Sequence, residues 1–196
     1  DLIIHKNMVF IIWILFMRVC KRYQRNGGVK MFKIDDYVIY GGNGVCKVTD
    51  VGVPEISRFD SEKEYYTLEP VYENGRIFAP VDNEKVVMRK VLTRQEADDL
   101  IGTIPSVEVN WIDNMKERDH EFKDIIQHYD CIGFVKIIKT IIEKKREYSS
   151  DGKKLSVSDA NYLKRAQEYL SGELAIALNI PKDTVNNYIE NRLKCM

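Results

Sequence analysis

The hydrophobic periodicity of this chain changes once, near residue 92, and that change limits the folds that it can adopt. From Phe32 to about Leu92, short aromatic and β-branched runs alternate with Gly and Asn, a pattern typical of strands joined by hairpins. From Thr93 onward, apolar residues recur at helical spacing. The sequence therefore predicts an α+β protein: a small SH3- or Tudor-like β-barrel followed by an all-α domain of about five helices.

Local signals divide the two halves further. Strands are expected at 37–40, 45–53, 64–72, 76–81 and 84–92. Thr93 with Glu96 forms a capping box before the first helix, and Gly102 is its expected stop. Later helices are expected at about 111–128, at 131–148, from Ser156 to about Leu178, and from Pro181. In the helix at 131–148, one apolar face is expected from Ile132, Val135, Ile138 and Ile142.

Residues 1–30 differ from the rest. They carry six Lys or Arg against Asp1 alone, and Met8 to Met17 is an apolar run of ten residues. A membrane-spanning helix needs about 20 such residues, so this run is too short. The stretch "GGVKM" favours a start at Met31, which makes 1–30 a non-native or disordered leader; an interfacial anchor is the alternative. Domains are then expected at 31–92 and 93–196.

Composition excludes several functions. The formal net charge is zero, so the average gives no nucleic-acid signal, and neither nucleotide-binding glycine motif occurs. The four cysteines form no C-x-x-C pair and are expected to be free thiols in the cytoplasm. His120 and His128 flank Asp124, but solvated surface histidines are favoured over a metal site. No enzyme activity, metal or cofactor is predicted.

Several segments resemble one known family. "MFKIDDYVIYGGNGVCKV" is similar to the opening of the CarD family, whose pattern is roughly F-x-x-G-D-x-V-x-Y-x-x-H-G, although Asp35 replaces the usual Gly and Asn43 the usual His. Tyr66, Leu68, Pro80, Val81 and Arg89 resemble the later strands. Asn110-Trp111 and "KKLSVSDANYLKRAQEYLSGELAIAL" resemble its helical half. The family shares its N-terminal domain with the bacterial transcription-repair coupling factor.

The resemblance implies a bacterial transcription regulator whose β domain docks on the RNA polymerase β subunit by edge-strand pairing. The candidate strand is "GRIFAPV", with Arg76, Ile77 and Phe78 as contacts. A buried position for Ile77 or Phe78 is an equal alternative, because alternate strand residues face the interior.

The resemblance also implies that the helical domain meets promoter DNA at the upstream edge of the melted bubble, with Trp111 as a minor-groove wedge that stabilises the open complex. From the sequence alone, without the resemblance, core packing is the favoured role of Trp111. Basic residues would hold phosphates nearby, although a solvated charged face remains the alternative. The candidate basic residues are Lys116, Arg118, Lys144, Lys145, Arg146, Lys153 and Lys154.

Two other functions remain open. Residues 173–193 resemble a helix-turn-helix, whose second helix would offer Lys182, Asn186, Asn187 and Asn191 to a major groove. A protein-only adaptor is the other, and a fully buried Trp111 would favour it. The expected partners are the polymerase β subunit and promoter DNA, with no small-molecule substrate and no membrane, and the chain is expected to be a monomer.

Overall fold

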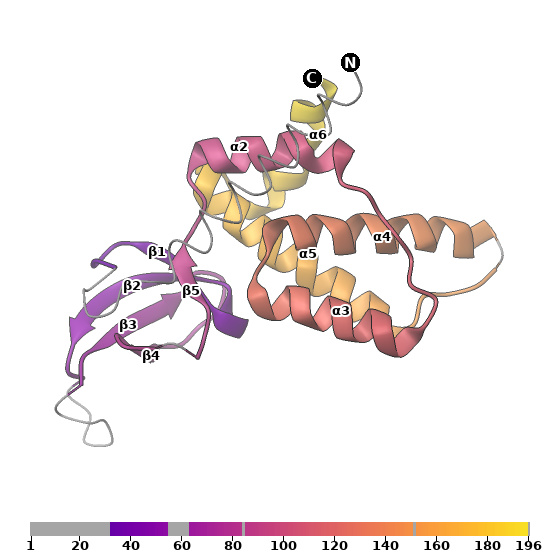
Figure 1. Ribbon diagram of the computed structural model, residues 1–196. Helices are drawn as coiled ribbons and strands as arrows, with labels where there is room; N and C mark the ends of the chain where they lie inside the picture. Colours follow the sequence, from indigo (N-terminus) through magenta and orange to yellow (C-terminus); the bar gives the residue numbers. More distant parts are fainter. Residues whose placement is uncertain (1–31, 55–62, 84, 151, 196) are drawn as a thin grey trace, which may run out of the picture. The chain divides into compact units, whose positions relative to one another are not determined.

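The computed structural model describes residues 32–54, 63–83, 85–150 and 152–195, so the expected leader at 1–30 lies outside the described residues. Phe32–Met196 form one compact unit, in which strands come first and helices follow (Figure 1). The predicted α+β class is confirmed.

Five strands form one antiparallel sheet. They are β1 (Tyr37–Tyr40), β2 (Val45–Gly52), β3 (Tyr65–Pro70), β4 (Ile77–Pro80) and β5 (Met88–Lys90). Their order across the sheet is β4-β3-β2-β1-β5, so β4 and β5 are the edges. The short 3-10 helix η1 (Gly41–Asn43) makes the turn between β1 and β2. Each strand lies within its predicted segment, because aromatic and β-branched runs favour extended backbone.

The helical part contains five α-helices in the described residues. They are α2 (Arg94–Thr103), α3 (Met115–His128), α4 (Cys131–Ser150), α5 (Val157–Leu178) and α6 (Val185–Lys194), with 3-10 turns η2 (Ile104–Ser106) and η3 (Lys182–Thr184). The predicted capping box at Thr93 and Glu96 is present, and Ser156 caps α5 by accepting from the Asp159 amide. These caps are local, so the sequence predicted them correctly.

Three helix predictions need correction. The second helix begins at Met115, because Asn114 caps it, and Trp111 therefore lies before the helix. The last begins at Val185, because η3 follows Pro181. In α4 the predicted apolar face is correct at Val135, which is buried, but Ile132, Ile138 and Ile142 are only half-buried. The fully buried side chains are Phe134, Ile137 and Ile141, because α4 packs against both α3 and α5.

The sheet has its own core. Val38, Val48, Leu68 and Ala79 are completely buried. Asp35, just before β1, has a φ of 73°, a left-handed conformation that glycine adopts without strain. The usual Gly at this position of the family pattern is thereby explained. Here Asp35 instead forms an ion pair with Lys47 at 2.7 Å.

One buried ion pair joins the sheet to the helices. Arg89 of β5 makes a two-pronged contact with Glu173 of α5, through Nη1 to Oε1 and through Nη2 to Oε2 at 2.8 Å. Glu173 is only 1% exposed. It also accepts from the Leu92 amide at 3.0 Å and from the Cys131 thiol at 3.2 Å. The carboxylate is therefore fully satisfied although it is out of water.

Two tyrosines strengthen the same joint. Tyr72, which follows β3, donates its hydroxyl to the carbonyl of Gly172 at 2.9 Å. A Cβ on Gly172 would come within 3.0 Å of that ring, so a larger residue would push the ring away. Tyr169 of α5 donates to the carbonyl of Gly42 in η1 at 3.1 Å. The strand part therefore contacts α5 at Tyr169 and at the adjacent residues Gly172 and Glu173.

We predict that Glu173→Ala destabilises the protein by about 3–5 kcal/mol, because it leaves the Arg89 guanidinium half-buried without its partner. Urea unfolding measures the change. The matched control is Glu168→Ala on the same helix, whose exposed ion pair with Lys182 should contribute less than about 1 kcal/mol. Equal losses in the two variants would contradict a special role for Glu173.

Candidate nucleic-acid interface and docking strand

Trp111 lies in the segment that joins η2 to α3. Asn114 accepts from the amides of Lys116 and Glu117, at 3.0 and 3.4 Å, and this cap sets the start of α3. The preceding segment is held to α4 by Lys139, whose ammonium donates to the carbonyls of Ile104, Pro105 and Val107. The backbone on both sides of Trp111 is therefore anchored.

The Trp111 ring is half-buried among cationic and aromatic groups. The guanidinium carbon of Arg118 is 4.1 Å from the ring centroid, and the Lys144 ammonium is 5.4 Å from it. Tyr148 of α4 meets the ring edge-on, at a centroid distance of 6.3 Å. These contacts hold the ring in place and leave part of it accessible.

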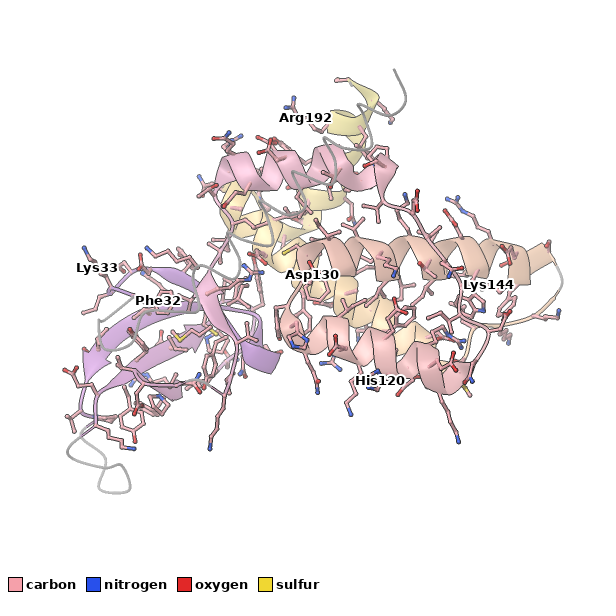
Figure 2. The ribbon with its side chains drawn as sticks, in the orientation of Figure 1. Phe32, Lys33, His120, Asp130, Lys144 and Arg192 are labelled. Atoms are coloured by element: carbon pink, nitrogen blue, oxygen red, sulfur yellow. The ribbon has the colours of Figure 1, made fainter. Side chains whose placement is uncertain are left out.

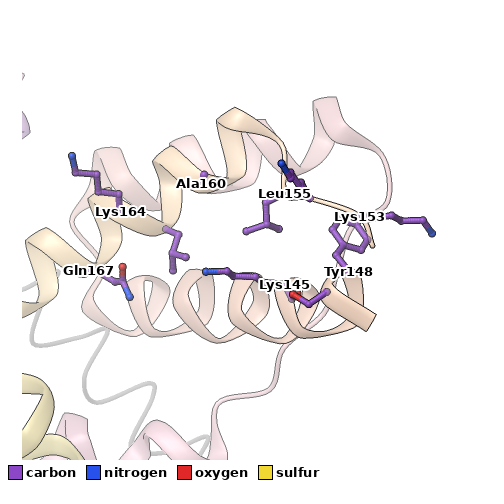
Figure 3. Close-up of a pocket in the computed structure, with 10 residues that line it drawn as sticks. Lys145, Tyr148, Lys153, Leu155, Ala160, Lys164 and Gln167 are labelled. Carbon is purple, nitrogen blue, oxygen red and sulfur yellow. The ribbon is translucent and has the colours of Figure 1, made fainter. Parts of the chain in front are cut away.

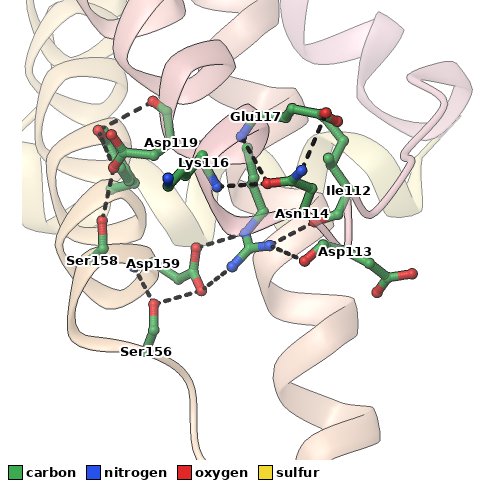
Figure 4. A network of polar contacts seen from close by, with 11 residues as sticks. Ile112, Asp113, Asn114, Lys116, Glu117, Asp119, Ser156, Ser158 and Asp159 are labelled. Carbon is green, nitrogen blue, oxygen red and sulfur yellow. Dashed lines mark hydrogen bonds and ion pairs between the residues drawn. The ribbon is translucent and has the colours of Figure 1, made fainter.

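Arg118 is positioned differently from the expectation. It is 6% exposed, and its Nε and Nη2 donate to the two carboxylate oxygens of Asp159 at 2.9 and 3.0 Å (Figure 4). Its Nη1 donates to the carbonyl of Ile112 at 2.6 Å. Ser156 donates its hydroxyl to Asp159 at 2.7 Å. A guanidinium committed in this way is poorly placed to contact a phosphate, and in this structure Arg118 packs against the Trp111 ring.

The other predicted basic residues come from three segments that meet at one end of the helical part. The ion pair between Arg118 and Asp159 joins the first turns of α3 and α5. The aromatic contact between Trp111 and Tyr148 places the end of α4 next to them. Figure 2 shows Lys144 on α4, toward the end farther from the strands. The exposed basic side chains here are Lys116, Lys145, Arg146, Lys153 and Lys154. Lys144 is less accessible, and its pairing with Glu147 at 2.8 Å raises its pKa.

Two apolar side chains at this end were missed by the sequence reasoning. Met115 is 56% exposed and Val157 is 79% exposed, and they are the first residues of α3 and α5. The available signal was an apolar residue directly after each capping residue, Asn114 and Ser156. This end of the helical part therefore combines exposed cations, a tryptophan ring fixed by its neighbours and two exposed apolar side chains.

The predicted docking strand is β4, and it lies at an edge of the sheet. Among the residues that the structure describes, its strand partner is β3, with Leu68 opposite Ile77 and Thr67 opposite Phe78. Ile77 and Phe78 are half-buried, while Arg76 is exposed and pairs with Glu69 at 3.0 Å. The outer side of β4 is thus a backbone edge of the kind that β-augmentation uses.

Cysteine and metal chemistry receive no support from the described residues. Burial raises the pKa of Cys46 to about 12, and burial followed by the Glu173 charge raises that of Cys131. Both thiols are therefore protonated at neutral pH and are poor nucleophiles. No group of three or more potential metal ligands occurs in the described part of the chain. Within that same part, every helix is too short or too polar to cross a bilayer.

The strand part and the helical part each match a different family model. Residues 32–92 match the family model of the CarD-like/TRCF RID domain, and residues 100–190 match that of the CarD C-terminal domain. The chain therefore belongs to the CarD family, transcription regulators that interact with RNA polymerase and are not known as enzymes. A search among curated proteins found no significant match.

We predict that Asp159→Ala releases Trp111, because Arg118 loses the carboxylate that holds it against the ring. In a Trp13→Phe background, acrylamide quenching of Trp111 fluorescence should increase, and the free energy of unfolding should fall by about 3–5 kcal/mol. The control is Asp119→Ala, which removes an exposed acceptor of Ser158 and Tyr162 and should cost less than about 1 kcal/mol. Unchanged quenching in Asp159→Ala would contradict the positioning role.

Proposed function

We propose that this protein docks on the β subunit of RNA polymerase through β4 and holds Trp111 against promoter DNA at the upstream edge of the melted bubble. The bound ring hinders reclosure of the duplex and lengthens the lifetime of the open complex. The observation that carries the proposal is the half-buried Trp111 ring, stacked on a buried Arg118 at the same end as the exposed cations.

The physical basis of the wedge is pre-organisation. An apolar or aromatic side chain at a distorted base step must offset an unstacking cost of a few kcal/mol. A ring that is already held by Arg118 and Tyr148 loses little conformational freedom on binding. Met115 and Val157 add exposed apolar surface at the first turns of α3 and α5. None of these groups reads base edges, so the contact is not sequence-specific.

The cations provide modest attraction. Lys116, Lys145 and Arg146 are exposed and suited to phosphates, but Asp113 and Glu147 lie among them. Affinity for DNA alone is therefore weak in this proposal. Docking through β4 offsets the weakness, because it converts DNA binding into a step within one complex at high effective concentration.

The alternatives receive less support. The asparagines of α6 are exposed, but Lys182 pairs with Glu168 and Arg192 lies 4.0 Å from Asp98, so both cations are engaged within the protein. This leaves the proposed recognition helix with few groups for phosphate. A fully buried Trp111 would have favoured the adaptor hypothesis, and Trp111 is only half-buried.

We predict that Trp111→Ala shortens the open-complex lifetime by roughly 5- to 150-fold, which corresponds to the 1–3 kcal/mol of one base–aromatic stack. Polymerase binding should stay unchanged, because β4 is untouched. Competitor-challenged dissociation of promoter complexes measures the lifetime, and Trp111→Phe should retain part of it. A normal lifetime in a folded Trp111→Ala protein would rule out the wedge.

For the docking strand, we expect Arg76→Ala combined with Ile77→Ala to weaken binding to the polymerase β subunit by about tenfold, since both side chains lie at or next to β4, the edge strand of the sheet. Surface plasmon resonance with the full chain measures the affinity. Lys90→Ala, on β5 at the opposite edge, is the control and should bind normally. A loss in Lys90→Ala instead would assign docking to β5.

A further inference from the structure

Residues 107–114, called here the Trp111 segment, lead from η2 to α3 and form neither helix nor strand. Without a helical or sheet ladder of its own, the backbone of this segment depends on groups that reach it from the helices. On the α3 side, Arg118 donates from Nη1 to the carbonyl of Ile112 at 2.6 Å. On the η2 side the corresponding anchor is Lys139 of α4. Trp111 therefore lies between two cations that hold backbone carbonyls.

Lys139 uses its whole donor capacity on this backbone. Its ammonium donates to the carbonyls of Ile104, Pro105 and Val107, at 3.0, 3.3 and 2.6 Å, and an ammonium has three donors. The last carbonyls of a helix lack partners within it, and neither α2 nor η2 has a basic residue in its own last turn. Lys139 therefore caps the end of η2 and fixes the point from which the Trp111 segment starts.

The other neighbours of the Trp111 ring hold it less firmly. Tyr148 meets the ring edge-on, but Tyr148 also lines a cavity of about 360 Å³ between α4 and α5 (Figure 3). A side chain beside empty space has fewer packing contacts that keep it in place. The Lys144 ammonium is shared between both rings and Glu147. The position of Trp111 therefore depends strongly on how its backbone is anchored.

We propose that Lys139 is a positioning residue for the open complex: it fixes the start of the Trp111 segment and so keeps the Trp111 ring in one position for contact with DNA. Lys139 does not itself contact DNA, because its three donors are already used on the backbone. The effect on the open complex rests on the proposed function, whereas the effect on the position of the ring does not.

The contacts of Lys139 also allow this role to be tested without unfolding the protein. Its partners are neutral carbonyls, so a substitution leaves no charged partner behind. Pro105 is exposed and Ile104 and Val107 are only half-buried, so water can replace the ammonium at their carbonyls. Lys139→Met keeps most of the aliphatic side chain and removes only the charge and the donors.

Acrylamide quenching of Trp111 fluorescence and the lifetime of promoter open complexes test the proposal, on the full chain in a Trp13→Phe background. Lys139→Met should increase quenching about twofold and shorten the lifetime about three- to tenfold, with polymerase binding unchanged. Lys139→Arg keeps a cation with several donors and should restore most of both values. The matched control is Lys136→Met on the same helix, which removes an ion pair with Glu121 at 2.7 Å and should leave both values normal.

A double-mutant cycle shows whether Lys139 acts through the ring. In a Trp111→Ala background, Lys139→Met should shorten the open-complex lifetime no further. The proposal is overturned by unchanged quenching in Lys139→Met, by an equal change in Lys136→Met, or by further shortening in the Trp111→Ala background. If Lys139→Met does not fold, Lys139→Gln, whose neutral amide keeps two donors, should show a smaller change in the same direction, and unchanged quenching there overturns the proposal equally.

The two readouts separate this inference from the proposed function. A normal open-complex lifetime in Trp111→Ala rules out the wedge, while increased quenching in Lys139→Met would still show that Lys139 positions the ring. A short lifetime in Trp111→Ala with a normal lifetime in Lys139→Met supports the wedge and overturns the positioning role of Lys139.

Discussion

The buried pair of Arg89 and Glu173 is the constraint on which the arrangement of the sheet and helices depends. A carboxylate that is 1% exposed is costly to desolvate, and it is tolerated here because four donors reach it. Such a pair is satisfied in only one geometry, so it ties β5 to α5 in a single register. Tyr72 and Tyr169 add hydrogen bonds at the same joint.

That joint bears on the proposed function, since the candidate docking strand and the candidate wedge belong to opposite sides of it. β4 lies at the sheet edge, and Trp111 lies beside α3 and α4. A protein that docks with one part and contacts DNA with the other needs a fixed relation between them. A buried ion pair with geometric demands meets that need better than an apolar contact, which tolerates sliding.

A second buried ion pair, between Arg118 and Asp159, fixes the position of a single side chain at the other end of the helices. Asp159 holds Arg118, and Arg118 holds the Trp111 ring. The same segment is fixed behind Trp111 by Lys139 and its three carbonyls. Arg118 and Asp159 are charged residues of a kind usually found on the surface, but here they are buried. They keep the Trp111 ring in a defined position at the surface of the protein.

The sequence by itself determined the local features. Strand positions followed from β-branched and aromatic runs, and the Thr93 and Ser156 caps followed from side chains that bond amides three residues away. The resemblance in residues 31–190 indicated the family, which the matched domains confirmed. Only the resemblance to the family suggested a functional role for Trp111 and for β4.

Only the tertiary structure decided which residues meet. Arg89 and Glu173 are separated by 84 positions and Arg118 and Asp159 by 41, so no local pattern links them. The sequence placed Arg118 among the DNA contacts because an arginine on a charged helix resembles a solvated one, and the apolar face of α4 was misplaced because two helices pack on it. Whether a charge is paired or free depends on partners brought close by folding, and periodicity carries no information about them.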